Sequence, residues 1–297
     1  MDSFKERVDG AKEKKRAAFS SIIAAVFLTT LKLIVGIVTN SLGILSEAAH
    51  SGLDLMAAGT TYGAVTVSAK PPDEDHQYGH GKVESLAGLF EVALLIITCV
   101  WIVYEAWHRF IGGIHLAEAN YVGFAVMGIS IIVDFSRSRM LYRMARKHHS
   151  QALEADALHF STDILSSSVV IVGLLFVRFG FLFADTVAAL GVAVFTVITS
   201  LRLGVRTTEV LLDRAPEGMV RLIEKEAMEV DGVIDCHNIR TRRSGGYTFL
   251  DMHICVEENT PTNEAHEIAS NVEKKVKDLV PRSDIVVHVE PSSEKAK

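Results

Sequence analysis

Two segments decide the fold: LSEAAHSGLD at residues 45–54 and EADALHFSTD at residues 154–163. Both lie in long apolar stretches, and in both a histidine precedes an aspartate by four positions. The residues concerned are His50, Asp54, His159 and Asp163. Side chains four positions apart lie on one face of an α-helix. Because hydrocarbon offers an ionisable group no partner, such pairs in apolar helices indicate a functional site within a membrane.

The composition excludes several classes of protein. The chain has 297 residues, of which 49% are hydrophobic and only 22% charged, and this excludes an intrinsically disordered protein. The net charge of −6 argues against a nucleic-acid partner. The three cysteines cannot build a disulfide framework, so we expect a reducing compartment for the soluble part.

Apolar residues are concentrated before residue 207, in six segments that approach the roughly 20 residues a spanning helix needs. The segments are 17–39, 42–67, 85–107, 120–136, 153–179 and 181–203. We therefore expect a basic cytoplasmic arm at 1–16, a domain of six transmembrane helices at 17–207 and a cytoplasmic domain at 208–297. No small-residue cleavage site follows the arm, which favours a retained helix over a signal peptide, with a signal anchor as the alternative.

The distribution of Lys and Arg predicts the orientation. The arm and the stretch 137–147 are basic, and Arg202 and Arg206 flank the last segment, whereas the connections near 40–41 and 180 have little positive charge. Positive charge favours the cytoplasmic side, so we expect a multi-pass protein of the inner membrane with both termini in the cytoplasm. Residues 208–297 hold 12 Lys+Arg and 18 Asp+Glu, so the cytoplasmic domain is acidic.

The two His–Asp pairs predict a metal site. If their helical faces oppose each other, two imidazole nitrogens and two carboxylate oxygens form a tetrahedral ligand set for Zn²⁺ or a similar divalent ion. Two alternatives remain: hydrogen bonds between packed helices, and a proton relay without metal.

Other polar and small residues in the apolar segments favour less specific roles. We expect Lys32 to extend to the membrane surface, and Asp134 to support the ligands or to handle protons. Gly59 and Gly63 form a GxxxG pattern that predicts close helix packing.

The connection between the second and third segments is a second candidate site. Its sequence SAKPPDEDHQYGHGKVE, residues 68–84, contains Asp73, His76 and His80, which could supply three ligands. The alternative is a solvated turn, since prolines and glycines flank these residues.

The cytoplasmic domain reads as a small α+β fold of order αββαβ. A helix begins at Pro216, strands surround the turn Ser244–Gly246, a second helix follows Pro261, and the last strand contains VVHVEP at 286–291. Five residues of this domain could form one or two metal sites: His237, His253, His266, His288 and Glu290. Cys236 and Cys255 are better explained as buried thiols, and His266-Glu267 lacks the second histidine of a zinc-protease HExxH.

These motifs together resemble the cation diffusion facilitator family, over residues 15 to 291, and the bacterial zinc-efflux members most of all. The resemblance rests on LSEAAHSGLD, DEDHQYGHGK at 73–82, EADALHFSTD and VVHVEP. It implies a homodimeric antiporter that exports a divalent metal in exchange for protons. No organic cofactor is expected.

The resemblance also implies roles for individual residues. The two His–Asp pairs would form the transport site, Asp73 with His76 and His80 a loop site, and the five residues of the cytoplasmic domain a regulatory site where two copies meet. Lys82 and Asp213 match a charge pair at the family's dimer interface. Two residues depart from the pattern: Glu290 stands where Asp is usual, and Glu47 stands where many relatives have Asp.

The ligand types alone support exchange of metal for protons. Neutral imidazole and carboxylate bind a divalent ion and their protonated forms do not, so metal and protons compete. The physiological ion could also be Fe, Co, Cd or Mn. A metal-sensing membrane scaffold is a rival interpretation, and an intramembrane hydrolase is a weaker one, because four protein ligands leave no open position on the metal.

Overall fold

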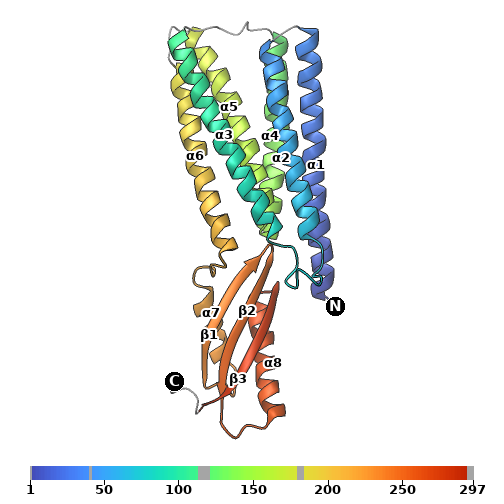
Figure 1. Ribbon diagram of the computed structural model, residues 1–297, viewed down its shortest axis with the longest axis vertical. Coiled ribbons are helices and arrows are strands. Elements are labelled where there is room, and N and C mark those ends of the chain that lie inside the picture. Colours follow the sequence, from blue (N-terminus) through green and yellow to red (C-terminus); the bar gives the residue numbers. More distant parts are fainter. Residues whose placement is uncertain (1, 40–41, 113–120, 179–183, 293–297) are drawn as a thin grey trace. The chain divides into compact units, whose positions relative to one another are not determined.

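The computed structural model describes residues 2–39, 42–112, 121–178 and 184–292. Two compact units make up the chain, residues 1–208 and residues 209–297 (Figure 1). The first is built of long helices, and the second contains the three strands of the described chain.

The first unit contains six long helices, one for each predicted apolar segment (Figure 1). They are α1 (Asp2–Val38), α2 (Leu42–Ser68), α3 (Val83–Gly112), α4 (Tyr121–His148), α5 (Gln151–Arg178) and α6 (Ala184–Leu211). Within the described residues, three stretches are apolar enough to cross a membrane: Asp9–Thr39, Val83–Trp101 and Leu190–Leu211. These belong to α1, α3 and α6. The prediction of six spans therefore stays a prediction for α2, α4 and α5.

Small residues allow these helices to pack closely. α1 packs mainly against α2, and α5 packs against α4 and α3. The buried cluster at their contacts contains Ala17, Ala18, Ala64, Ala87, Ala145, Ala152 and Ala157 around Leu141, Leu153 and Phe160. Without a strong hydrophobic driving force between helices in lipid, such close backbone approach provides van der Waals contact.

The glycine pattern of α2 does not contribute to this packing. A Cβ atom added at Gly59 or Gly63 would meet no heavy atom of the described residues within 4 Å. The prediction that these glycines lie at a close helix contact is therefore wrong within one chain. Ala57, Ala58 and Ala64 of the same helix are buried instead.

Lys32 also differs from expectation. Its side chain does not reach outward but is buried, and its Nζ atom donates to Ser51 Oγ at 2.8 Å and lies 3.2 Å from Glu47 Oε2. The prediction that Lys32 extends to the membrane surface is wrong, because α2 provides two oxygen acceptors within its reach.

The second unit has the predicted order αββαβ. Its elements are α7 (Met219–Met228), β1 (Asp235–Ser244), β2 (Tyr247–Val256), α8 (Thr262–Leu279) and β3 (Ser283–Pro291). The first helix begins at Met219 rather than Pro216, because Gly218 takes a left-handed conformation with φ 74° just before it. The sheet order is β1-β2-β3, with β1 antiparallel and β3 parallel to the central β2.

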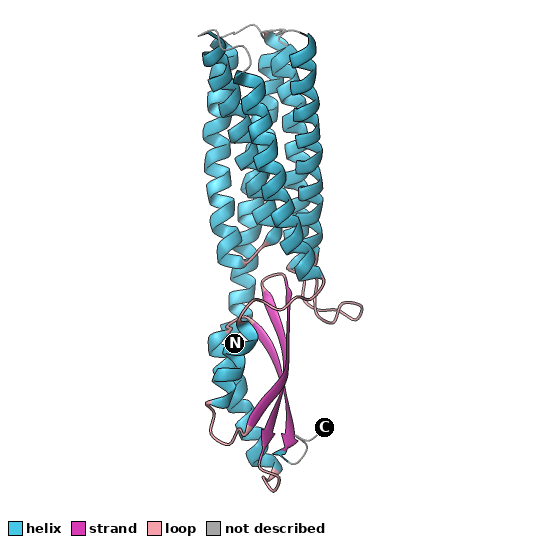
Figure 2. Cartoon of the chain, turned by 90° about the vertical axis from the view of Figure 1, so that its left-hand side faces the viewer, coloured by secondary structure: helices cyan, strands magenta, loops and turns pink. Residues whose placement is uncertain are grey.

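The two helices of this unit cover one face of the sheet (Figure 2). Alternate residues of β2, namely Leu250, Met252 and Ile254, pack with α7 and α8 into a single core. Because side chains alternate across a strand, His253 lies on the opposite face. The fold thus separates the apolar residues of β2 from the candidate metal ligand between them.

Candidate metal centres

The structure brings the two His–Asp pairs together across α2 and α5. His159 Nε2 lies 2.9 Å from Asp54 Oδ1 and 3.9 Å from Asp163 Oδ2. His50 Nε2 lies 3.5 Å from Asp163 Oδ1 and 3.9 Å from Asp54 Oδ1. Each histidine thus approaches both aspartates, including the one on the other helix.

These distances suit a single small ion. Ligand atoms bound at 2.0–2.1 Å around a tetrahedral zinc ion lie about 3.3 Å apart, and the four nitrogen–oxygen separations of 2.9 to 3.9 Å bracket that value. Ligand atoms of His50, Asp54 and Asp163 all lie within 4.8 Å of one another, and His159 approaches this group most closely through Asp54. Asp54 and His159 are buried, and His50 is half-buried. Two nitrogen and two oxygen donors in a low-dielectric interior favour a divalent ion of the Zn²⁺ type.

Arg137 and Asp134 of α4 lie near this centre. Arg137 is buried, 3.5 Å from Asp134 Oδ1, donates to Ser21 Oγ at 2.7 Å, and stacks 3.5 Å above the Phe160 ring. Asp134 therefore has a cationic partner on its own helix, and its expected roles in supporting the ligands or handling protons stay predictions.

Glu91 of α3 is a buried carboxylate that the sequence analysis missed. It is 0% exposed and accepts a hydrogen bond from Thr61 Oγ1 at 3.1 Å. The available signal was an acidic residue near the middle of the apolar stretch 85–107, whereas the other acid of that stretch, Glu105, lies at its end.

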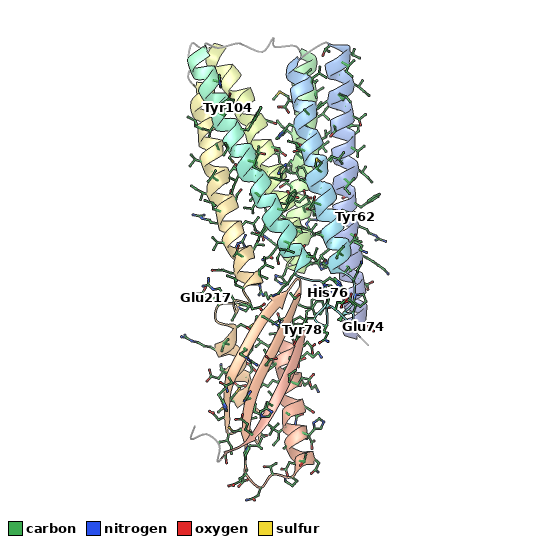
Figure 3. The ribbon with its side chains drawn as sticks, viewed as in Figure 1. Tyr62, Glu74, His76, Tyr78, Tyr104 and Glu217 are labelled. Carbon is green, nitrogen blue, oxygen red and sulfur yellow. The ribbon has the colours of Figure 1, made fainter. Side chains whose placement is uncertain are left out.

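The loop between α2 and α3 brings Asp73, His76 and His80 together, and Figure 3 labels His76 there. Asp73 Oδ1 lies 3.1 Å from His76 Nδ1, and Asp73 Oδ2 lies 3.3 Å from His80 Nε2. The His76 backbone N–H donates to Asp73 at 2.7 Å and, with both imidazoles, lowers the pKa of that carboxyl. Asp73 is thus held in the ionised form that binds metal.

In the second unit, strand register places three histidines in one row. His237 of β1 pairs with His253 of β2, which pairs with His288 of β3. Neighbouring ring centroids are 5.5 and 4.8 Å apart. Cross-strand neighbours lie on the same face of a sheet, so the three imidazoles point to the face opposite α7 and α8.

Glu290 connects the three histidines. Its carboxylate oxygens lie 2.6 Å from His253 Nδ1, 3.2 Å from His237 Nε2 and 3.7 Å from His288 Nε2. The hydrogen bond with His253 lowers the pKa of the Glu290 carboxyl below its usual value, and the charges of the other imidazoles act in the same direction. The departure from Asp to Glu therefore still places the carboxylate among the imidazoles.

A second row follows two residues along β2. Asp235, Cys255 and Glu290 are cross-strand neighbours, and ligand atoms of Asp235, His237 and Cys255 approach one another within 4.8 Å. Asp235 was missed by the sequence analysis, although it precedes His237 by two positions, as His288 precedes Glu290. Cys236 points to the core, and burial raises the pKa of its thiol to about 11, as expected of a buried thiol.

Three predicted residues remain outside these clusters within one chain. His266 is exposed on α8, which covers the other face of the sheet, so it cannot join the histidine row of its own chain. The part of His266 in a site shared by two copies stays a prediction. Lys82 and Asp213 belong to different units, and their pairing stays a prediction.

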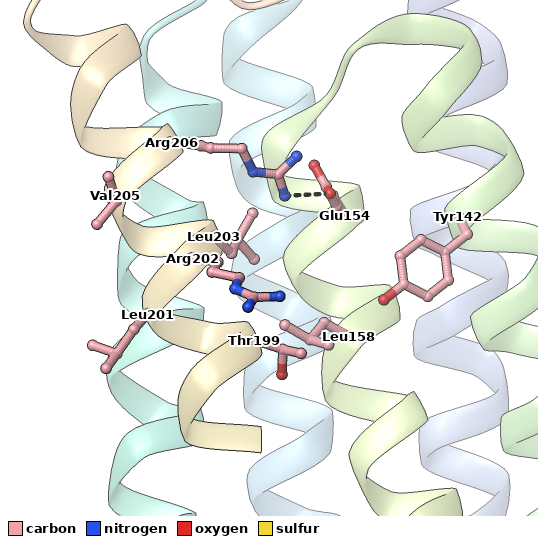
Figure 4. Close-up of a pocket in the computed structure, with 9 residues that line it drawn as sticks. All are labelled: Tyr142, Glu154, Leu158, Thr199, Leu201, Arg202, Leu203, Val205 and Arg206. Carbon is pink, nitrogen blue, oxygen red and sulfur yellow. Dashed lines mark hydrogen bonds and ion pairs between the residues drawn. The ribbon is translucent and has the colours of Figure 1, made fainter. Parts of the chain in front are cut away.

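A pocket of about 630 Å³ lies between α4, α5 and α6, apart from the candidate ligands (Figure 4). Its walls are mostly apolar, with Leu158 and Leu203 among them, and Arg206 pairs with Glu154 at 2.6 Å across it. None of the predicted metal ligands lines this pocket.

Long apolar helices with a buried four-ligand centre, followed by a small domain with ligands on one sheet face, define a membrane transporter of metal cations. Residues 18–212 match the family described as the cation efflux transmembrane domain, and residues 215–292 match the cytoplasmic domain of cation efflux proteins. The chain therefore belongs to the cation efflux family, as its motifs indicated.

Curated relatives agree with this assignment. The chain is 33% identical over 285 residues to the "Cation-efflux pump FieF" of Yersinia pestis (strain Pestoides F), covering 94% of this chain and 93% of that protein. The same figures hold for the protein of that name from Yersinia pseudotuberculosis serotype O:3 (strain YPIII). Among solved structures, "MamM-CTD 215-293" is 29% identical, with a TM-score of 0.25, and covers 25% of this chain and 96% of that one.

Proposed function

We propose that the protein exports Zn²⁺ across the inner membrane in exchange for protons. The observation that supports this most is the convergence of His50, Asp54, His159 and Asp163 at separations suited to one tetrahedral ion. Borderline donors of this kind favour Zn²⁺ over larger, oxygen-preferring ions such as Mn²⁺. The relatives named as cation-efflux pumps support transport in the outward direction.

The contacts within the centre support exchange with protons. His159 shares a hydrogen with Asp54, and His50 lies within ion-pair distance of Asp163. The same nitrogen and oxygen atoms would bind the metal, so a proton on either imidazole and an ion between them exclude each other. Loading at cytoplasmic pH then releases protons, and protonation from the other side expels the ion.

The architecture we propose is a homodimer of chains with six spans each and with both termini in the cytoplasm. Aromatic residues support a membrane boundary at one end of α3, where Trp101, Tyr104 and His108 form ring contacts, and Figure 3 labels Tyr104. Aromatic side chains gather where a membrane meets water. In the dimer, His266 of one copy would complete the histidine row of the other.

The loop and tail centres would have supporting roles. Asp73 and His76 are exposed and His80 is half-buried, and these three donors suit transient capture of an ion. The tail is acidic, and ions bound at its histidine row would reduce repulsion between two copies.

A metal-sensing scaffold is the second candidate, because the loop and tail centres alone would suffice for sensing. Reconstituted vesicles distinguish the two. Purified protein in proteoliposomes with a pH gradient should move Zn²⁺. Separate assays with Fe²⁺, Co²⁺, Cd²⁺ and Mn²⁺ test the other ions. Zn²⁺ movement that stops when the pH gradient is dissipated supports antiport. Binding of zinc without movement of any ion would favour the scaffold.

A further inference from the structure

Lys32 is a buried cation beside the transport centre, and it is not one of the proposed metal ligands. Its side chain is 8% exposed, and its Nζ atom is 2.8 Å from Ser51 Oγ and 3.2 Å from Glu47 Oε2. Thr29, one turn earlier on α1, donates to the Ser51 carbonyl at 2.9 Å. These contacts fix α1 against the turn of α2 that contains His50.

The helix positions bring this ammonium close to the metal ligands. Ser51 directly follows His50 and precedes Asp54 by three positions, so Lys32 contacts the turn of α2 from which both ligands project. Lys32 also interacts electrostatically with Asp163 of α5 and Asp134 of α4. In a low-dielectric interior, a charge at this position acts strongly on an ion bound by the ligands.

The position of Glu47 along α2 indicates on which side of the transport centre Lys32 lies. Glu47 lies five residues after the start of α2 at Leu42, whereas the loop with Asp73 follows the other end at Ser68. Under the proposed orientation the loop is cytoplasmic, so Lys32 lies on the release side of the centre. Glu47 is half exposed there, and its charge is screened more than that of Lys32.

We propose that Lys32 is a positioning residue that lowers the affinity of the transport centre for its divalent ion, so that the ion leaves on the release side. The inference rests on the proposed function. Repulsion between a fixed ammonium and a divalent ion weakens binding, and Glu47 partly offsets that repulsion. A transporter needs an affinity high enough to load and low enough to release.

Removing the charge of Lys32 and removing the charge of Glu47 should change the zinc affinity in opposite directions. Lys32→Met should lower the zinc dissociation constant of the purified full-length protein by about tenfold or more, because the repulsion is lost. In proteoliposomes it should lower both the half-saturating zinc concentration and the maximal rate, since release becomes slow. Glu47→Gln should raise the dissociation constant and the half-saturating concentration while the maximal rate is kept.

Two further variants separate charge from structure. Lys32→Arg keeps the positive charge and should bind zinc within about twofold of wild type. The double variant Lys32→Met plus Glu47→Gln should bind zinc less tightly than Lys32→Met alone, because an attractive charge has been removed. Loop and tail ions are excluded by measuring binding in a background of Asp73→Ala with His237→Ala and His288→Ala, because His237 belongs to both tail groups.

The outcomes are separable from failure of the proposed function. If wild-type protein moves no ion, the transport proposal fails. If wild type moves zinc and Asp54→Ala does not, but Lys32→Met and Glu47→Gln both leave the dissociation constant unchanged or shift it in the same direction, Lys32 does not set the affinity. If Lys32→Met does not fold, unaltered affinity in Glu47→Gln overturns the inference.

Discussion

His159 Nε2 lies 2.9 Å from Asp54 Oδ1, although the two residues are 105 positions apart in the chain. Their contact joins α2 to α5, and each helix contributes its own i, i+4 partner to the same centre. A centre that spans two helices is sensitive both to the loss of one ligand and to relative movement of the helices.

Loss of one carboxylate should abolish transport. Asp54→Ala or Asp163→Ala removes an anionic ligand from a low-dielectric site, and we expect zinc flux at least about 100-fold below wild type. Membrane insertion, measured by fractionation, and dimer formation, measured by gel filtration, should be unchanged. Glu154→Gln, which removes a half-buried carboxylate of α5 that pairs with Arg206 and not with a ligand, is the control. Near-normal flux in either aspartate variant would contradict the assignment of the centre.

The identity of the donor at position 50 should set ion preference. His50→Asp replaces a nitrogen donor with oxygen, and we expect transport to broaden toward Cd²⁺, with the preference for Zn²⁺ reduced by about tenfold. Competition between the two ions in proteoliposomes measures this. His266→Asp on α8 is the control outside the helical unit. An unchanged ratio would show that His50 does not determine selectivity.

The loop centre should bind an ion without being essential. Asp73→Ala should remove about one zinc per chain, counted on purified protein, because this carboxylate contacts both imidazoles. Flux should fall only in part, since the four membrane ligands remain. Glu74→Gln changes the neighbouring exposed acid and should retain the ion. Equal metal content in the two variants would argue for a solvated turn.

The tail should be stabilised by metal through its histidine row. In isolated residues 209–297, which form a compact unit with their own core, His253→Ala plus His288→Ala should lower the zinc-induced rise in Tm. Arg240→Ala plus Asp251→Ala removes an exposed ion pair from the same strands and is the control. In the full protein the histidine variant should lose only part of its flux. A wild-type tail whose Tm does not change with zinc would contradict the sensor role.

Without metal, the tail should lose a contribution to stability in acid. The pKa of Glu290 is below its usual value of 4.5 in the folded tail, so ionised Glu290 stabilises the fold above that pH. The contribution is lost as the pH falls through the lowered pKa. The Tm difference between wild type and Glu290→Gln, measured in chelator from pH 6 down to 3, should therefore shrink. A difference that grows in acid would show the opposite sign.

Sequence periodicity was sufficient to place the two His–Asp pairs on common helical faces and to predict the order of elements. The i, i+4 spacing placed His50 with Asp54, and His159 with Asp163, on common faces, and alternation along β2 separated His253 from the core. Both rules depend only on local geometry, which the chain determines within a few residues.

Properties that depend on a neighbouring element were not predictable in this way. Lys32 is buried because Ser51 and Glu47 of another helix accept from it, and Gly59 is open because none of the described residues of the same chain packs against it. Strand order likewise determines that Asp235 and Glu290 lie on either side of Cys255. Periodicity identifies a face of an element but does not identify what lies opposite that face.

The histidine row has a consequence for the assembly of the sheet. His253 faces His288 only because β3 pairs with β2 in one particular alignment. A slip of one residue would place Val287 or Val289 opposite His253 and turn His288 toward the side that α8 covers. An ion that requires both imidazoles would therefore bind the correctly aligned sheet and not its nearest misaligned forms. A bound metal ion would thus favour the correct register of a three-stranded sheet whose central strand pairs antiparallel with β1 and parallel with β3.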